Sequence, residues 1–408
     1  MTYAAILTAS GILLLAFAIE RLCLALKVPS VIILIATGLA LRPVIEGFHI
    51  TPRGLDTVVP IIGTLGLILI VLEGAMDLQL KRGRMRRILI SVAVAAGGLL
   101  AVIAAFTGLA ALAFDLPTMQ AMLLAIPFAV ISSAVAISSS GFLPPAQREF
   151  IVYESSLSDI FGVLLFFSLL HSDGTARGAL LALAGGGALS LGLSVLFAVG
   201  LVLILMRIDG HVRFIPLLAG LFGLYALGEL LHLSPLILVL LFGLTLNNPQ
   251  LLARVPAFRN WFDESYEERL EQFKMLVLEL TFAVRGFFFL LLGYWTQPSD
   301  VATINAWLVA GVILITIYGS RYLLLRAAQL PLASTLTWIA PRGLVTVLLL
   351  LHAQNALKVP GYLNGAVILV VLVSAGLIGI ARLELAKTVK PEPAAAAAPE
   401  PAPETHEP

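Results

Sequence analysis

The sequence predicts an all-α integral membrane protein, and three observations support this fold class. Hydrophobic residues make up 60% of the 408 residues and charged residues only 12%, whereas soluble domains carry about 25% charged residues. The mean hydropathy is +1.02. The apolar residues also gather in long runs, and a helix that spans a bilayer needs about 20 of them. The net charge of +1 argues against a nucleic-acid partner, and the single cysteine, Cys23, excludes an internal disulfide.

About thirteen apolar runs are long enough, or nearly so, to cross a membrane as helices. The first run ends in ERLCLALK without a small-residue cleavage site, which predicts an uncleaved first helix. The runs fall at residues 3–20, 29–46, 58–80, 88–114, 118–140, 149–171, 177–206, 212–231, 234–248, 273–294, 302–327, 333–353 and 361–386.

The basic residues support this count and give an orientation. Of the 25 Lys and Arg residues, eighteen fall in one set of alternate loops together with the C-terminal end. The other set holds only Arg42, Arg53, Arg177 and Lys358. Because cytoplasmic loops are enriched in Lys and Arg, we expect a multi-pass protein of the inner or plasma membrane. Its N-terminus should lie outside and its C-terminus in the cytoplasm.

Two segments are not expected to span the membrane. Residues 251–272 mix Trp261 and Phe262 with acids and arginines, which predicts an amphipathic interfacial helix that joins two halves. Residues 391–408, PEPAAAAAPEPAPETHEP, are of low complexity and should be disordered.

Ionisable residues within the apolar runs indicate a functional site, because an Asp or Arg at the bilayer centre costs about 2.5–3.5 kcal/mol on insertion scales. The stretch YESSLSD, residues 153–159, carries two acids. On a helix, Asp159 lies about 140° round from Glu154, so the two carboxylates face different neighbours. We expect one to line a water-filled cavity and the other to pair with a cation on another helix. Pairing of both with buried arginines is the alternative.

Two further runs carry polar residues at unusual positions. FAVISSAVAISSSGFLPP, residues 128–145, crowds serines whose hydroxyls can bond the backbone or replace water around a cation; close packing of small residues is the alternative. In WIAPRGLVTVLLL, residues 338–350, Pro341 removes a backbone hydrogen bond and Gly343 loosens the chain beside Arg342. This span should break and point half-helix dipoles inward, unless it only kinks and Arg342 snorkels.

The chain resembles the bacterial and archaeal sodium/proton antiporters of the cation:proton antiporter superfamily, on the NhaP-like branch, from about residue 15 to 385. YESSLSDIFGVLLF is similar to the family's Glu-Ser/Gly-x-x-Asn-Asp motif, and LIVLEGAMDLQLKRGRMRR to its Phe-Glu-Gly-Gly-Leu segment. GSRYLLLR resembles the helix whose arginine pairs with the motif glutamate. APRGLVT is similar to the Gly-Leu-Arg-Gly segment.

The resemblance implies an inverted-repeat antiporter fold with crossed broken helices, in which the fifth span pairs with the twelfth. A core is expected to move against a dimerisation part. The implied division places dimerisation helices 1–3 in residues 1–86, core helices 4–6 in 87–171, a linking helix 7 in 172–206, dimerisation helices 8–10 with the interfacial helix 251–272 in 207–294, core helices 11–13 in 302–386 and a disordered tail in 387–408.

The resemblance also implies roles for individual residues. Glu154 and Arg321 would form a structural ion pair, and Arg342 would lie in the broken helix. The proton and cation would bind among Asp159, Ser155, Glu73, Ser132, Ser133 and Ser158, with the metal ion itself on Asp159, Ser155 and Glu73.

The sequence departs from the family pattern at two places. The family's Thr-Asp-Pro appears as Ser132-Ser133-Ala134, and Ser158 stands in place of the motif asparagine. Serine hydroxyls can replace the missing carboxylate as a ligand but cannot replace its charge.

These residues predict a secondary active transporter that exchanges Na⁺, or Li⁺ or K⁺, for H⁺. Burial favours the neutral form of a carboxylate and a nearby cation favours the charged form, so Asp159 should hold a proton or a cation by turns. Such hard cations take oxygen ligands. Because electrogenic relatives place a second aspartate where Ser158 stands, we expect one-for-one electroneutral exchange. No cofactor is expected; the partners would be the two ions, membrane lipid and a second copy in a homodimer.

Two other classes of protein are alternatives. An intramembrane enzyme needs a nucleophile with a base in reach, but the serines of SSSG, residues 138–141, have no clearly mid-membrane His or Lys to serve them. A cation channel or a non-exchanging sensor on the same fold is the other alternative. A channel passes current under voltage without a proton gradient, and an electroneutral exchanger does not.

Overall fold

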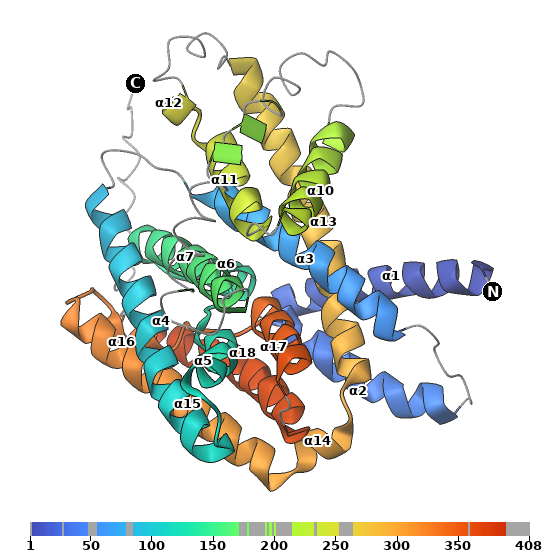
Figure 1. Cartoon of the computed structure of the whole chain (residues 1–408), viewed down its shortest axis with the longest axis vertical. Helices are drawn as coiled ribbons and strands as arrows, with labels where there is room; N and C mark the ends of the chain where they lie inside the picture. The colour runs from blue at the N-terminus through green and yellow to red at the C-terminus, as the bar shows by residue number, and fades with distance from the viewer. Residues whose placement is uncertain are drawn as a thin grey trace, which may run out of the picture.

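The structure is a computed structural model that describes residues 2–26, 28–47, 55–78, 85–170, 214–231, 235–252, 264–357 and 360–388, with a few single residues between 178 and 200. The elements within these residues are all helices (Figure 1). In chain order they are α1 (Thr2–Leu26), α2 (Ser30–Gly47), α3 (Leu55–Asp77), α4 (Met85–Phe114), α5 (Thr118–Ala129), α6 (Ser133–Ser139), α7 (Pro145–Leu170), α10 (Phe214–Leu230), α11 (Pro235–Asn247), α12 (Pro249–Leu252), α13 (Glu264–Trp295), α14 (Pro298–Ala302), α15 (Ile304–Ala327), α16 (Ala333–Thr337), α17 (Leu344–Ala356) and α18 (Tyr362–Thr388).

The helices follow the predicted spans. Each predicted span coincides with one helix or with two helices around a break, except 177–206, which lies outside the described residues apart from single positions. The all-α integral membrane class is confirmed, and the total of thirteen spans stays a prediction. By length and composition, six helical segments of the described residues could cross a membrane: Arg86–Leu112, Thr118–Ser139, Pro145–Leu170, Tyr266–Trp295, Ile304–Ala327 and Tyr362–Lys387.

The segment 251–272 is arranged differently from the single interfacial helix that we expected. α12 ends at Leu252, and residues 253–263 lie outside the described part of the chain. α13 begins at Glu264 and continues without interruption to Trp295, so residues 264–272 are the first turns of a long helix. This continuity has a local cause, because the helix meets no Gly or Pro before Gly286.

The predicted tail is only partly described. α18 continues to Thr388, and residues 389–408 lie outside the described part of the chain.

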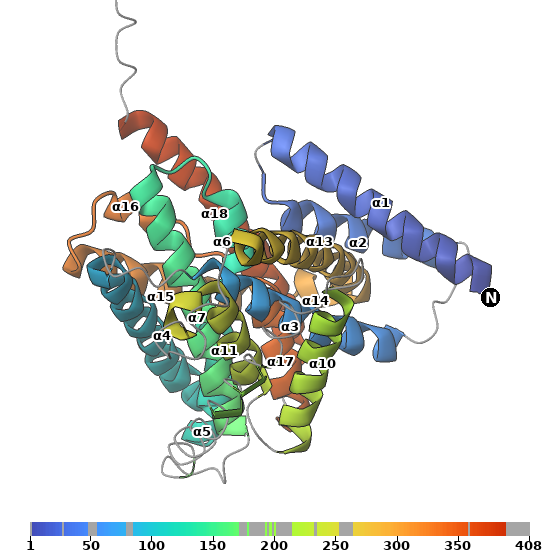
Figure 2. The same ribbon diagram turned by 90° about the horizontal axis from the view of Figure 1, so that it is seen from above.

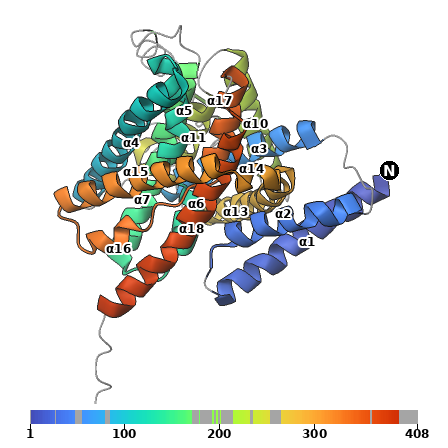
Figure 3. The ribbon, with the colours of Figure 1, turned by 90° about the horizontal axis from the view of Figure 1, so that it is seen from below.

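The helices pack in two groups with α3 between them. α13 packs against α2 and α3, and α11 packs against α3 and α10. On the other side, α4 packs against α5, α7 and α15, and α15 packs against α18. Figures 2 and 3 show α1, α2 and α13 at one side of the molecule and α4, α15 and α16 at the opposite side. Because α3 also contacts α6, α7 and α17, its residues lie at the seam between the groups.

The fifth predicted span is interrupted. α5 ends at Ala129, and α6 starts at Ser133 after an extended segment, in which Ser132 has φ −71° and ψ 112°. Pro127 lies near the end of α5 and supplies no N–H to the helix ladder. The chain therefore leaves the helix with several backbone N–H groups that need partners elsewhere.

The twelfth predicted span is interrupted as well. α16 ends at Thr337 and α17 starts at Leu344. Pro341 lies in this second break, and a proline disfavours helical geometry at the residue before it. Gly343 lies so close to the first break that a Cβ atom there would overlap the Ser132 hydroxyl. The two breaks therefore touch, and the contact requires glycine.

Candidate functional site

Three consecutive backbone N–H groups of the first break are satisfied by other helices. The Ile131 N–H donates to Oγ of Ser158, at 3.0 Å, and the Ser132 N–H donates to the carbonyl of Pro341 in the second break, at 2.9 Å. The Ser133 N–H donates to Oδ2 of Asp159, at 3.0 Å. Non-helical backbone at membrane depth needs such protein partners. Two side chains of α7 and one carbonyl of the second break thus hold the first break in place.

Asp159 lies at the centre of this arrangement. Asp159 is 4% exposed, and its neighbours on α7 are also buried. Oδ2 accepts the bond from Ser133, and Oδ1 has no hydrogen-bond partner among the residues that the structure describes. α7 can come this close because Gly162 has no side chain; a Cβ atom there would overlap Val130 of the break. A carboxylate with one free, buried oxygen is suited to accept either a proton or a cation.

Arg342 occupies the second break and is 1% exposed. Its backbone N–H donates to Oγ of Ser374 on α18, at 2.9 Å. The guanidinium interacts electrostatically with Asp159 and Glu154, but Nε and Nη1 have no hydrogen-bond partner within the described part of the chain. The buried positive charge therefore offsets nearby carboxylates at a distance rather than closing a tight ion pair with one of them.

Glu154 and Arg321 form a buried bidentate ion pair. Nη1 and Nη2 of Arg321 donate to the two carboxylate oxygens of Glu154, at 2.5 and 2.8 Å. The Arg321 side chain is 7% exposed and the Glu154 side chain 2%. Nε of Arg321 also donates to the carbonyl of Leu336 on α16, at 3.0 Å. The pair therefore fastens α7 to α15 and α16, and the carboxylate of Glu154 has no free oxygen for a substrate.

Glu73 reaches the site from α3. Its side chain is half-buried and interacts electrostatically with Asp159 and with Arg285 of α13. Nη1 of Arg285 approaches the carbonyl of Ala134 on α6, at 3.5 Å. Residues from three separate helices thus meet beside the first break, and Glu73 is the second carboxylate there.

The predicted serines differ in how their hydroxyls are used. Ser155 is buried and donates to the carbonyl of Ile151, at 2.7 Å. The backbone N–H groups of Ser132 and Ser133 donate to Pro341 and Asp159. The hydroxyl of Ser133 also lies beside Asp159. Ser158 acts as an acceptor for the first break.

Sequence reasoning missed two buried hydroxyls of this region. Ser156 lies within the stretch YESSLSD and is 1% exposed, yet its Oγ has no hydrogen-bond partner among the described residues. Its spacing of three residues from Asp159 on one helix could have indicated it. Ser374 holds the Arg342 backbone, and no pattern in the sequence indicates that role.

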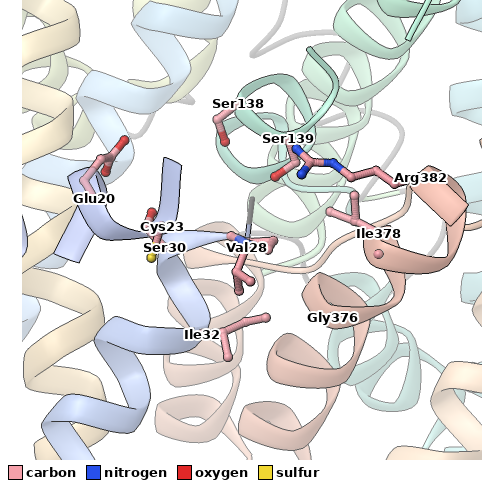
Figure 4. Close-up of a pocket in the computed structure, with 12 residues that line it drawn as sticks. Glu20, Cys23, Val28, Ser30, Ile32, Ser138, Ser139, Gly376, Ile378 and Arg382 are labelled. Carbon is pink, nitrogen blue, oxygen red and sulfur yellow. The ribbon is translucent and has the colours of Figure 1, made fainter. Parts of the chain in front are cut away.

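One cavity in the described part of the chain lies away from Asp159. It has a volume of about 300 Å³ and lies between the α1–α2 corner on one side and α6 and α18 on the other (Figure 4). Its polar lining includes Glu20, Ser30, Ser138, Ser139 and Arg382. Because an α-helix rises about 1.5 Å per residue, Ser139 at the C-terminal end of α6 lies about 9 Å from Ser133 along the helix axis. Ser133 is the residue that bonds Asp159, so the length of α6 separates this cavity from Asp159.

A second cavity, of about 190 Å³, is lined by α13, α14, α17 and α18, with Asp300 and Asn364 among its residues. α18 lines both cavities, through Val367 here and Gly379 in the larger one. Twelve residues of helix separate these two positions by about 18 Å. The cavities therefore lie toward opposite ends of α18, with the polar cluster around Asp159 outside both.

The described residues contain no group of three or more His, Cys, Asp or Glu side chains placed to hold a metal ion. A cation bound beside Asp159 would therefore have to use hydroxyl or backbone oxygens in addition to carboxylates.

Two interrupted helices whose breaks meet beside a buried carboxylate define a class of membrane protein, the secondary transporters with discontinuous helices at the bilayer midplane. Within this class, the chain belongs to the sodium/hydrogen exchanger family, because the model of that family, described as "Sodium/hydrogen exchanger, transmembrane", matches residues 11–383. The function of the chain is accordingly secondary active exchange of sodium ions and protons. Comparison with the sequences of curated proteins gives no significant match.

Solved structures with the same fold include the sodium proton antiporter MjNhaP1 from Methanocaldococcus jannaschii at pH 8. That chain is 22% identical, with a TM-score of 0.72, and the match covers 94% of this chain and 99% of that one. An electron-microscopy map of MjNhaP1 gives 19% identity and a TM-score of 0.70 over 96% of this chain and 100% of that one. At these identities the likeness establishes the fold, and the inverted-repeat antiporter fold is confirmed. The proteins found in both comparisons are transporters rather than enzymes.

Proposed function

We propose that the protein exchanges Na⁺ for H⁺ by competition of the two ions for Asp159. The observation that carries this proposal is the state of that carboxylate. It is buried, one oxygen accepts the Ser133 N–H, and the other oxygen has no hydrogen-bond partner among the residues that the structure describes. Burial favours the protonated form and an adjacent cation favours the ionised form. One ion therefore displaces the other, and neither binds while the other is present.

The cation ligands would be oxygens from α3, α6 and α7. Asp159 and Glu73 supply carboxylates, and Ser155 and Ser133 supply hydroxyl oxygens. We propose that Ser132 and Ser158 contribute indirectly, since the Ser132 N–H bonds the second break and the Ser158 hydroxyl accepts the Ile131 N–H. The free guanidinium atoms of Arg342 would balance the charge of the site while the cation is absent.

We further propose that exchange is one-for-one and electroneutral, since Ser158 is not ionisable. The test uses proteoliposomes with an inward Na⁺, Li⁺ or K⁺ gradient at pH values of about 6 to 9, because a carboxylate that exchanges protons works best when its pKa lies near the operating pH. We expect proton movement without net charge movement. Lowering the pH by one unit should raise the half-saturating Na⁺ concentration by about tenfold where the proton form dominates. A voltage-driven current without a proton gradient would favour the channel alternative.

We propose that access alternates between the two cavities. With the predicted orientation, the C-terminal end of α18 lies toward the cytoplasm, so the cavity at Gly379 would face inward and the cavity at Val367 outward. Asp159 is reached from neither cavity in this structure, so the ion would enter when the group of α4–α7 and α15–α18 moves against α1–α3 and α13.

A cysteine experiment tests the alternation. Because the chain has one cysteine, Cys23→Ala gives a thiol-free background, into which Ser138→Cys and Asn364→Cys are introduced separately. We expect an impermeant thiol reagent to label position 138 only from the cytoplasmic side and position 364 only from the outside. Conditions that increase one reactivity should decrease the other. Labelling of both positions from the same side would contradict the proposal.

The predicted homodimer, the lipid contacts and the location in the inner or plasma membrane are also part of the proposal. They rest on the resemblance of the motifs and on the loop charges. A native-mass measurement of the protein in mild detergent checks the dimer.

A further inference from the structure

The three buried serines of α7 next to Asp159 use their hydroxyls differently. Ser155 donates to the carbonyl of Ile151, and Ser158 accepts the N–H of Ile131. Ser156 is as deeply buried as they are, at 1% exposed, but its Oγ has no hydrogen-bond partner within the described residues. A buried polar atom without a partner destabilises the folded state. Serine at position 156 is therefore not explained by the stability of the fold.

The Ser156 hydroxyl lies over a backbone position without a side chain. A Cβ atom built on Gly74 of α3 would lie 3.7 Å from Oγ of Ser156 and 4.0 Å from Oγ of Ser133. Two hydroxyls, one from α7 and one from α6, thus converge on a single small volume. Glu73 is the residue before Gly74 on α3, and its buried Oε2 is also without a partner among the described residues.

The same volume lies beside the exchanging carboxylate. Ser156 precedes Asp159 by three residues, so the two side chains differ by about 60° around α7. Ser133 donates its N–H to Oδ2 of Asp159, whose Oδ1 is free of partners in the described part of the chain. Ser156 and Ser133 thus both face Gly74 of α3, and Ser133 in turn bonds the carboxylate of Asp159.

We propose that Ser156 is a ligand of the transported cation, and that the volume over Gly74 is where a small, hard monovalent cation such as Na⁺ or Li⁺ binds. This inference rests on the proposed function and adds a ligand to it. The hydroxyls of Ser156 and Ser133 would supply neutral oxygen ligands in addition to the carboxylate of Asp159. Because a hydroxyl carries no titratable proton at these pH values, Ser156 sets the affinity for the cation without changing the number of protons exchanged.

The first test is the Na⁺ dependence of Ser156→Ala in proteoliposomes and in a thermal unfolding assay. A bound cation stabilises the folded state by RT ln(1 + [Na⁺]/Kd), so the dependence of the unfolding temperature on Na⁺ gives the dissociation constant without transport. We expect the half-saturating Na⁺ concentration for transport and the dissociation constant from the thermal assay each to rise roughly ten- to hundredfold, as for loss of one interaction with a charged group. The maximal rate and the electroneutrality should stay close to those of the wild type. The unfolding temperature without Na⁺ should be equal or higher, because the variant removes a buried hydroxyl that has no partner among the described residues.

The matched control is Ser91→Ala. Ser91 is also fully buried, but it lies on α4 and its hydroxyl donates to the carbonyl of Arg87, at 3.1 Å. Its removal should leave the Na⁺ titration unchanged. Gly74→Ala is the second variant, because its methyl group fits at ordinary contact distances yet fills the proposed volume. We expect Gly74→Ala to weaken Na⁺ binding at least as much as Ser156→Ala, which decides the matter if the serine variant fails to fold.

Unchanged Na⁺ titrations for both Ser156→Ala and Gly74→Ala would overturn the assignment of Ser156 while leaving competition at Asp159 intact. Failure of the proposed function is distinguishable, because it would appear as Na⁺-dependent exchange that persists in Asp159→Asn.

Discussion

Asp159→Asn is expected to abolish Na⁺/H⁺ exchange while the protein still inserts and folds. The amide can accept the Ser133 N–H as the carboxylate does, so the first break keeps its partner. The amide cannot bind and release a proton, and it offers a cation no charge. We therefore expect sodium-driven pH change in proteoliposomes to fall to the level of protein-free vesicles. We also expect the stabilisation by Na⁺ in thermal unfolding to disappear.

The control for this variant is equal incorporation into the vesicles together with an unfolding temperature close to that of the wild type without Na⁺. A loss of activity that accompanies a loss of folded protein would point to a structural role. Sodium-driven pH recovery at wild-type rates in Asp159→Asn would show that the exchanging carboxylate lies elsewhere, with Glu73 as the remaining acid at the seam.

Breaking the ion pair of Glu154 and Arg321 should instead destabilise the fold. Removing one partner of a buried pair leaves an uncompensated charge, which costs about 3–5 kcal/mol. Glu154→Gln and Arg321→Ala should therefore lower the unfolding temperature and the yield of folded protein. Arg321→Ala should have the larger effect because it also loses the bond to the Leu336 carbonyl. The half-saturating Na⁺ concentration of the protein that does fold should be close to that of the wild type.

Arg87→Ala is a matched control. Arg87 of α4 and Glu149 of α7 form an ion pair at the surface, at 3.1 Å, in which the Arg87 side chain is 63% exposed. An exposed pair contributes at most about 1 kcal/mol. Replacing the buried pair by apolar residues, as in Glu154→Leu with Arg321→Met, should recover much of the lost stability. If Glu154→Gln kept full stability and lost exchange, Glu154 would belong to the transport site.

Much of the fold could be predicted because lipid imposes a simple rule on a sequence. Runs of about 20 apolar residues predict spans, and the predicted spans fall on helices wherever the structure describes them. Pro341 and Gly343 indicated the second break, because both act on the backbone locally. The residues 264–272 show the limit of this reasoning, since their mixed charges indicated a surface helix but the absence of Gly and Pro lets α13 run through them.

The candidate site was less accessible to sequence reasoning. The free-energy cost of a charge in the membrane indicated Asp159, Glu154, Glu73 and Arg342. The separate uses of Ser155, Ser156 and Ser158 were not, because the three residues are chemically identical and their hydroxyls are distinguished only by what other helices bring to them.

The sequence alone determined that this chain is a multi-pass membrane protein with costly charges in a few spans, because hydropathy and the penalty for a buried charge depend on local composition. Only the tertiary structure decided which charge is neutralised and which is left free. Arg321 donates hydrogen bonds to both carboxylate oxygens of Glu154, whereas the Ser133 N–H donates to one carboxylate oxygen of Asp159. The reason is physical: these partners lie on helices far apart in the chain, and hydrogen bonds and ion pairs act only over a few ångströms.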